Sequence, residues 1–181
     1  MAKVTDHWLE HHYSLMRGCE NLRHLAEVAI GMALNVRESS PDGKVYLVSG
    51  PMTTGGVGPF HANMHVFGNC ITVARERGLT VFNQCPFQEG MIRILTLGKD
   101  PTYSASDKSY PQSILDDFYW PFFEAGVLTH LLLMPTWSSS NGATQERNKA
   151  LSIPNFILEE MSQELYDEAL ERSRHYLQSV L

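Results

Sequence analysis

Two loops of this sequence carry residue types that could hold and transform a small ligand. One spans residues 137–146 and reads WSSSNGATQE, so three serine hydroxyls precede a carboxylate where a helix is predicted to begin. Hydroxyls and unpaired backbone amides at a helix start can bind phosphate or sugar oxygens. Glu146 lies in the first turns of that helix, where its carboxylate can point into a crevice. There are two structural alternatives. Ser140 or Asn141 caps the helix, and Glu146 has only the favourable interaction with the helix dipole that is common near a helix start.

The other loop is rich in glycine and spans residues 50–59, GPMTTGGVGP. Its small residues let backbone amides approach a ligand, and the helix that follows offers positive potential to an anion. The loop matches neither the GxxxxGK(S/T) phosphate loop nor the GxGxxG dinucleotide fingerprint. A surface turn without a binding role is the alternative.

Both loops follow short apolar runs that are typical of buried strands. We expect strands in residues 44–49, 79–82, 128–134 and 155–158, and helices in residues 5–36, 60–77, 113–125, 142–151 and 159–180. No regular structure is assigned to residues 83–111. The alternation predicts an open, mostly parallel α/β sheet with helices on both faces. In such a sheet ligands bind outside the carboxyl ends of the strands, where both loops lie.

The helices predicted before residue 39 form an N-terminal extension. Residues 39–43, SSPDG, combine helix-stopping and turn-forming types, so they mark its end. We therefore divide the chain into an N-terminal helical extension, residues 1–43, and an α/β domain, residues 44–181.

Length and composition exclude several classes of protein. The chain has 181 residues, 43% of them hydrophobic and 19% charged, which suits a compact fold with a buried core. A net charge of -6 argues against binding to nucleic acid or to an anionic membrane. The most apolar segment, residues 125–137, is shorter than the ~20 residues of a membrane helix. Three widely spaced cysteines indicate neither disulfides nor a thiolate metal site, so we expect a cytoplasmic protein.

Two motifs together carry a resemblance to a known family. One consists of residues 45–52, VYLVSGPM, with Asn63 and Phe67 in the helix that follows, and the other of residues 132–137, LLMPTW, and 140–150, SNGATQERNKA. In order and placement they resemble the nucleoside 2-deoxyribosyltransferase superfamily, which includes nucleoside 5′-monophosphate N-glycosidases. The resemblance covers roughly residues 44–158. It implies a Rossmann-like, flavodoxin-like doubly wound sheet.

The resemblance implies that Glu146 is a nucleophilic carboxylate. Such a group attacks the anomeric carbon, expels the base through an oxocarbenium-like transition state and forms a covalent glycosyl ester. Tyr46 matches a tyrosine whose hydroxyl holds the nucleophile in relatives, with a core aromatic as the alternative. Ser140 lies where nucleoside transferases have an acidic residue and the monophosphate hydrolases a serine. Because a serine can donate to a 5′-phosphate that a carboxylate would repel, we expect a nucleotide substrate.

In the family an acidic residue before the strand of the serine loop assists the leaving base. Asp117, or next to it Asp116, occupies that place, although the spacing to Glu146 differs from the family's interval by a few residues. A solvated helix face is the alternative for both aspartates. Besides the catalytic residues Glu146, Tyr46 and Asp117, we expect the substrate to contact Ser49, Gly50, Pro51, Met52, Asn63, Asp116, Ser138, Ser140, Asn141 and Gly142.

We therefore expect an N-glycosidase or deoxyribosyltransferase that cleaves the N-glycosidic bond of a (deoxy)nucleoside 5′-monophosphate without a cofactor or metal. Its partners are small nucleosides or nucleotides, and the resemblance implies a homodimer or higher homo-oligomer. Two alternatives stay open. A phosphoribohydrolase of the cytokinin-activating kind uses a similar helix start, but its PGGxGTxxE motif is absent from the sequence. A catalytically silent nucleotide-binding or sensing protein would keep the same pocket.

Other polar and aromatic groups have simpler interpretations. His61 and His65 lie four residues apart and could bind a metal, but no third ligand at fitting spacing supports this. Cys85 follows a predicted strand and lacks an evident histidine partner, which favours a passive thiol. The aromatic residues within 120–123, WPFF, could stack on a base but are more typical of a core or a subunit interface.

Overall fold

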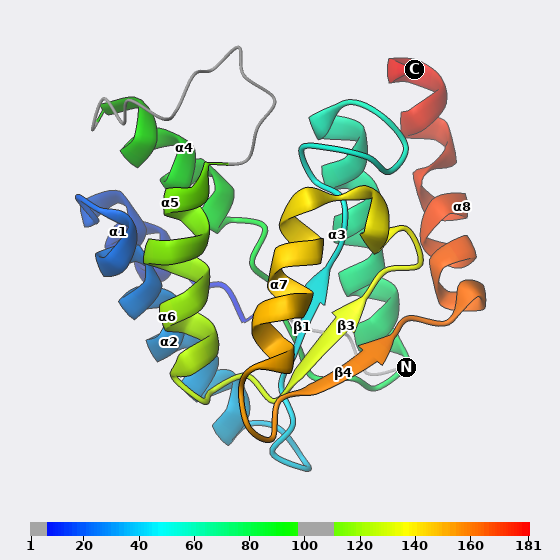
Figure 1. Cartoon of the computed structure of the whole chain (residues 1–181). Helices are drawn as coiled ribbons and strands as arrows, with labels where there is room; N and C mark the ends of the chain where they lie inside the picture. Colours follow the sequence, from blue (N-terminus) through cyan, green and yellow to red (C-terminus); the bar gives the residue numbers. More distant parts are fainter. Residues whose placement is uncertain (1–6, 98–110) are drawn as a thin grey trace.

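The computed structural model describes residues 7–97 and 111–181 and has a parallel β-sheet at its centre (Figure 1). The strands are β1 (Tyr46–Ser49), β2 (Val81–Phe82), β3 (His130–Leu133) and β4 (Ile157–Glu160). They lie in the order β2-β1-β3-β4, and each neighbouring pair is parallel. The predicted α/β class with a mostly parallel sheet is therefore confirmed, and this sheet is parallel throughout.

Alternation along the strands directs side chains into two separate cores. Leu47 and Leu131 pack on one face of the sheet, whereas Val48 and Leu132 pack on the other. Leu47 pairs with Leu131 in register, and Val48 pairs with Leu132, so each face carries a continuous apolar row. Both faces are buried, as the unbroken apolar runs of the sequence predict.

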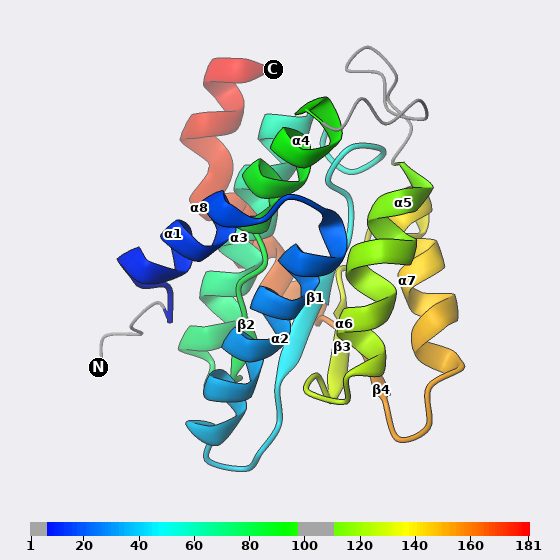
Figure 2. The same cartoon turned by 90° about the vertical axis from the view of Figure 1, so that its left-hand side faces the viewer.

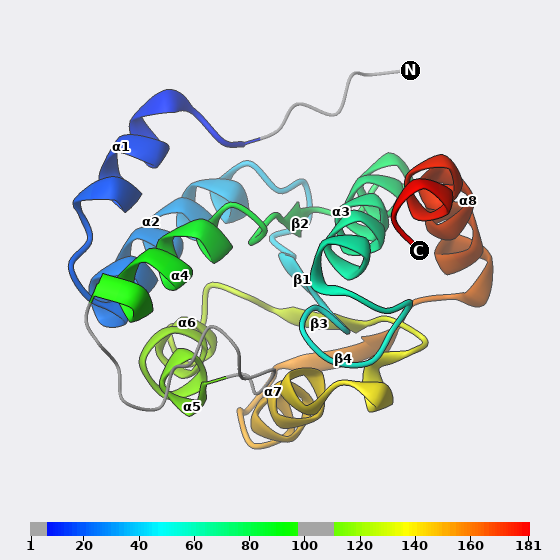
Figure 3. The same cartoon turned by 90° about the horizontal axis from the view of Figure 1, so that it is seen from above.

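Helices α3 (Phe60–Glu76) and α8 (Gln163–Val180) cover one face of the sheet (Figure 3). The two helices pack against each other along much of their length. Phe67 of α3 and Ala169 of α8 are fully buried in the cluster that contains Val48. α3 therefore connects β1 to β2 across this face.

The opposite face is covered by the remaining helices (Figures 2 and 3). These are α2 (Leu22–Glu38), α4 (Phe87–Leu97), α5 (Gln112–Ile114), α6 (Trp120–Glu124) and α7 (Asn141–Leu151), with α1 (Glu10–Gly18) packed against α2 and α4. A π-helical turn, Leu115–Tyr119, joins α5 to α6. Of the helices in the described parts of the chain, none is long and apolar enough to cross a membrane.

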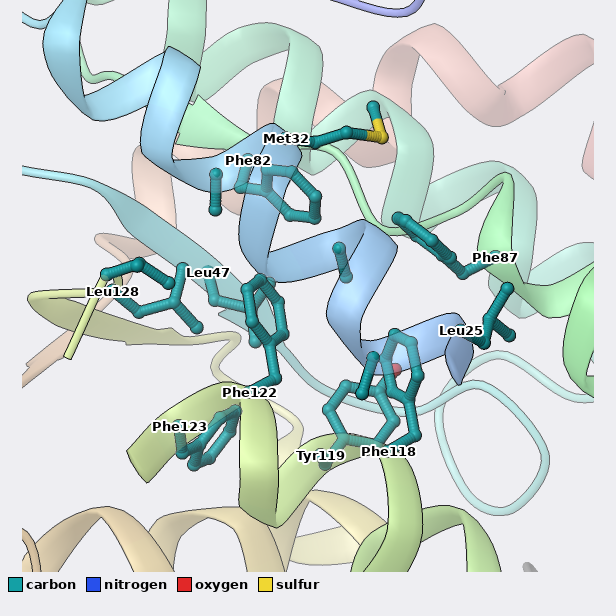
Figure 4. Packing of buried hydrophobic residues seen from close by; sticks show 14 of the residues in the cluster. Leu25, Met32, Leu47, Phe82, Phe87, Phe118, Tyr119, Phe122, Phe123 and Leu128 are labelled. Carbon is teal, nitrogen blue, oxygen red and sulfur yellow. The ribbon is translucent and has the colours of Figure 1, made fainter. Parts of the chain in front are cut away.

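Aromatic rings fill the core on this face (Figure 4). The rings of Phe82 and Phe122 meet edge to face with centroids 5.2 Å apart, and those of Phe87 and Phe118 lie 5.4 Å apart. All four side chains are fully buried. The packing favours the core interpretation of the aromatic run at residues 120–123 for Phe122 and its fully buried neighbour Phe123.

Several element boundaries differ from the predicted ones. Residues 7–36 of the expected first helix form two helices, because the chain turns after α1 and Asn21 caps α2 by accepting from the amide of His24 (2.8 Å). α4 lies where the sequence predicts no regular structure. The last strand begins two residues later than expected, after Asn155 takes a positive φ of 64°. Residues 5–6 and 98–110 lie outside the described residues.

The N-terminal helices contribute to the aromatic core. Leu25 and Ala29 of α2 are fully buried in the cluster that contains Leu47 and Phe82. The division of the chain between residues 43 and 44 stays a prediction, but the packing joins both segments through one hydrophobic core.

We expect Leu25→Ala to destabilise the sheet together with the N-terminal helices, because the leucine is fully buried in their shared core. Loss of a buried leucine costs roughly 2–5 kcal/mol of unfolding free energy. Denaturant titrations followed by circular dichroism and tryptophan fluorescence should give one coincident transition at lower denaturant. Leu34→Ala, at an exposed position of the same helix, is the control and should change the free energy by under about 0.5 kcal/mol. Separate transitions for the two probes would contradict the single core.

Candidate active site

The carboxyl ends of β1 and β3 define the candidate site. From β1 the chain crosses to β2 on one side, whereas β3 and β4 lie on the other, so the strand order reverses between β1 and β3. Ligands of open α/β sheets bind at such a reversal. The glycine-rich loop follows Ser49 and the serine loop follows Leu133, and these two residues pair in register. Figure 1 shows both loops at the end of the sheet to which these strands point.

The two loops contact each other directly. The backbone amide of Gly56 donates to Ser139 Oγ (3.1 Å), and that hydroxyl donates to the carbonyl oxygen of Thr136 (2.8 Å). Gly55 has a φ of +73°, and a Cβ at this position would collide with the backbone of Ser139. Glycine is therefore required where the loops meet. A Cβ on Gly50 would collide with the side chain of Met134.

Asn63 organises the glycine-rich loop. Its side chain is buried, and its Nδ2 lies 3.0–3.1 Å from the carbonyl oxygens of Met52, Gly55 and Gly58. Its Oδ1 accepts from the amide of Val57 (2.9 Å). Because both ends of the carboxamide bind the loop, the structure places Asn63 as a scaffold beneath the predicted binding loop. Pro51 and Met52 are buried at the start of that loop.

Glu146 is held at the end of β1 by a short hydrogen bond. α7 begins at Asn141, capped by Ser140 Oγ, which accepts from the amide of Ala143 (3.3 Å). In the second turn, Glu146 is 8% exposed, and Ser49 Oγ donates to its Oε2 (2.5 Å). Burial raises the pKa of the Glu146 carboxyl to about 7, and the hydrogen bond from Ser49 opposes that rise. A carboxylate with this pKa can act as a nucleophile or as a general acid or base near neutral pH.

The remaining residues of the serine loop surround the start of α7. Ser138 lies in a 3-10 turn, Trp137–Ser139, which leads directly into the cap residue Ser140. The Arg147 guanidinium lies over the Trp137 ring, 5.1 Å from its centroid. Gly142 is in the first turn of α7, where backbone amides have no helical acceptors. The structure therefore groups these predicted residues with Glu146 on one helix start.

The structure does not bring Tyr46 to Glu146. Tyr46 precedes Ser49 by three residues, and side chains an odd number of positions apart point to opposite faces of a strand. Its ring packs with the α3 and α8 core and stacks on His130, with centroids 4.4 Å apart. Ser49 contacts the Glu146 carboxylate instead. The geometry favours the core-aromatic interpretation of Tyr46.

The two aspartates proposed to assist the leaving base have other contacts. Asp117 Oδ1 accepts from Arg23 Nε (2.9 Å), and its side chain is 39% exposed. Asp116 Oδ1 accepts from Gln112 Nε2 (2.9 Å). In the hydrogen bonds and ion pairs of residues 7–97 and 111–181, neither aspartate contacts Glu146. The structure therefore favours surface interactions for both.

The histidine pair packs against α8, and the cysteine follows β2. His65 stacks on Tyr176 with ring centroids 4.2 Å apart, and His61 meets the same ring edge to face. Within the described ranges, no group of three or more His, Cys, Asp or Glu side chains could hold a metal ion. The Cys85 amide donates to Asn83 Oδ1 (3.1 Å) in the turn after β2.

Sequence reasoning missed a residue beside the strand that carries Ser49. Gln84 follows β2, is 1% exposed and donates from Nε2 to the carbonyl oxygen of Val48 (2.7 Å). Its position two residues after a predicted strand is the signal that could have found it, because ligand contacts gather after strand ends.

Comparison with known proteins found no relative of this chain. A scan against protein-family models, a search of curated proteins and a search of solved structures each gave no match. The interpretation of the site therefore depends on its own geometry and on the sequence motifs.

We expect Glu146→Gln to stabilise the folded protein at pH 8 but not at pH 5. The folded pKa of about 7 lies above the ordinary value of 4.5, so between these values the folded state binds more protons than the unfolded state. Stability contributed by this group is therefore complete below pH 4.5 and is lost as the pH rises through 7. A glutamine side chain carries no such penalty, and the variant should gain about 2–3 kcal/mol relative to the native chain at pH 8.

Unfolding titrations at both pH values measure this difference. Glu160→Gln, at an exposed position of β4, is the control and should show no such trend. A stability difference between Glu146→Gln and the native chain that stays constant from pH 5 to pH 8 would contradict the raised pKa.

We expect Asn63→Ala to loosen the glycine-rich loop while the sheet stays folded. The substitution removes the acceptor of the Val57 amide and the donor to three loop carbonyls. Hydrogen exchange of the Val57 amide should accelerate by about tenfold or more. Asn35→Ala, at an exposed site on α2, should leave that exchange rate unchanged. Equal protection of Val57 in both variants would show that Asn63 does not hold the loop.

Proposed function

We propose that this chain is an N-glycosidase or deoxyribosyltransferase that cleaves the bond between a base and the sugar of a (deoxy)nucleoside 5′-monophosphate. The observation that carries the proposal is the buried Glu146 carboxylate, which Ser49 holds at the carboxyl end of a parallel sheet. A wound, flavodoxin-like arrangement, with its ligand crevice between β1 and β3, agrees with the strand order.

In the proposed reaction Glu146 is the nucleophile. Ser49 donates to Oε2, which orients the carboxylate and leaves Oε1 to attack C1′ of the sugar. The ester bond forms as the C1′–N bond breaks, and the electron pair of that bond leaves with the base. Water or the N–H group of a second base then attacks C1′, and the carboxylate is released with the electron pair of the ester bond. The proton that the attacking group loses neutralises the base that has left. Water gives hydrolysis and a base gives transfer.

The start of α7 provides donors for a 5′-phosphate. Ser140 Oγ accepts from Ala143, and its hydroxyl hydrogen can still be donated to a phosphate oxygen. The first-turn amides and the helix dipole add positive potential at the same point. The Gly56 amide and Ser139 hydroxyl lie where the two loops meet. These groups support a nucleotide over an uncharged nucleoside.

We expect Glu146→Gln to lower the rate of base release by at least about a thousandfold, because the amide cannot form the glycosyl ester. The purified chain is incubated with a panel of nucleosides and 5′-monophosphates, with and without an acceptor base, and free base is measured by chromatography. Glu160→Gln serves as the control and should retain activity.

The pH dependence of the native chain adds a second readout. Since the ionised carboxylate is the nucleophile and burial raises its pKa to about 7, kcat/KM should rise with pH and level off above 7. Base release by Glu146→Gln at the native rate would exclude the mechanism.

A further inference from the structure

Two buried carboxamides lie near the candidate site, and each has one polar atom without a hydrogen-bond partner in the described part of the chain. Gln84 is 1% exposed and Gln88 is 8% exposed. Gln84 Oε1 and Gln88 Nε2 are buried atoms without a hydrogen-bond partner among the residues that the structure describes. Buried polar atoms are nearly always paired, and an unpaired one costs roughly 1–3 kcal/mol. Two such atoms four residues apart therefore point to partners that residues 7–97 and 111–181 do not provide.

The orientation of Gln84 is fixed by its other end. Gln84 Nε2 donates to the carbonyl oxygen of Val48 (2.7 Å), so Oε1 is the end of the amide that remains available as an acceptor. Val48 directly precedes Ser49, which donates to Glu146. Val48 accepts from Gln84, and the next residue, Ser49, donates to Glu146, so both groups lie at the same end of β1.

Gln88 lies close to Gln84 because of the turn that opens α4. The amide of Phe87 donates to the carbonyl oxygen of Gln84 (3.0 Å), and the amide of Gln88 donates to that of Cys85 (3.1 Å). Gln84 lies just before α4, and Gln88 is the second residue of that helix. An unpartnered acceptor and an unpartnered donor therefore both follow β2, the strand that pairs with β1, within one turn and the start of α4.

We propose that Gln84 and Gln88 recognise a planar ring that carries a carbonyl next to an N–H group. Gln84 Oε1 accepts from the N–H group, and Gln88 Nε2 donates to the carbonyl oxygen. The assignment rests on the proposed function, because it makes this ring the leaving group of the glycosidic bond that Glu146 attacks. The same edge occurs in lactam nucleobases and in the carboxamide of nicotinamide. Binding such a ring supplies both missing partners at once.

Two matched pairs of free ligands test this recognition on the full-length chain by calorimetric titration. Hypoxanthine has the lactam edge, whereas purine lacks both its carbonyl and the adjacent N–H. Nicotinamide has the carboxamide edge, whereas 3-acetylpyridine keeps the carbonyl and lacks the N–H. We expect hypoxanthine or nicotinamide to bind about tenfold or more tightly than its matched partner. The pair that shows the preference identifies the source of the edge.

Gln88→Met separates recognition from a structural role. Methionine has a similar length but no donor, so the preference should disappear. Because the variant removes an unpartnered buried donor, Tm of the ligand-free chain should stay equal or rise. Gln178→Met, at an exposed position of α8, is the control and should keep the preference.

Equal affinities within both pairs, or a preference that survives Gln88→Met, would overturn the assignment. Failure of the proposed function is a different result. If the native chain releases no base but its ligand preference disappears in Gln88→Met, the recognition pair is supported and the proposed mechanism is rejected. If the native chain releases base but shows no preference within either ligand pair, the mechanism is supported and the assignment of Gln84 and Gln88 is rejected.

Discussion

The buried hydrogen bond between Ser49 and Glu146 is the constraint on which the rest of the candidate site depends. It joins residues 97 positions apart, and both side chains are buried. The bond forms because the sheet fixes each partner independently. Ser49 ends β1, its carbonyl oxygen accepts from the amide of Met134 (2.9 Å), and the loop after Met134 leads into α7. The parallel pairing of β1 and β3 thereby sets the distance between strand end and helix start.

The loops above this bond are held by internal contacts. Asn63 binds the glycine-rich loop at both ends of its carboxamide, and the Gly56 amide ties that loop to Ser139. Groups that folding has already ordered lose less conformational freedom on binding a ligand. Asn63 thus contributes to the site by positioning backbone amides, a role distinct from the direct substrate contact that the resemblance implies. Glycine at position 55 is part of the same arrangement, because a side chain there would displace Ser139.

Sequence patterns predicted the parts of the molecule that depend on local periodicity. The apolar runs located all the strands of the described sheet, and the serine loop located the start of α7. Side-chain direction was also available, because Tyr46 and Ser49 are an odd number of residues apart and must face opposite sides of β1. Contacts between residues far apart in the sequence could not be predicted from local patterns. Nothing local to Asp117 indicates its ion pair with Arg23, which lies 94 positions away.

Buried polar side chains at the end of β1 differ from the apolar residues that pack along the rest of the strand. Along β1, Leu47 and Ser49 point to the same side, so Ser49 is the polar end of an otherwise apolar row. A valine there would extend the row but would leave the buried Glu146 carboxyl without its donor, at a cost that packing does not recover. The unpartnered atoms of Gln84 and Gln88 belong to the same end of the sheet. Stability alone favours apolar side chains at such positions, so packing does not explain why these polar atoms gather beside one strand end.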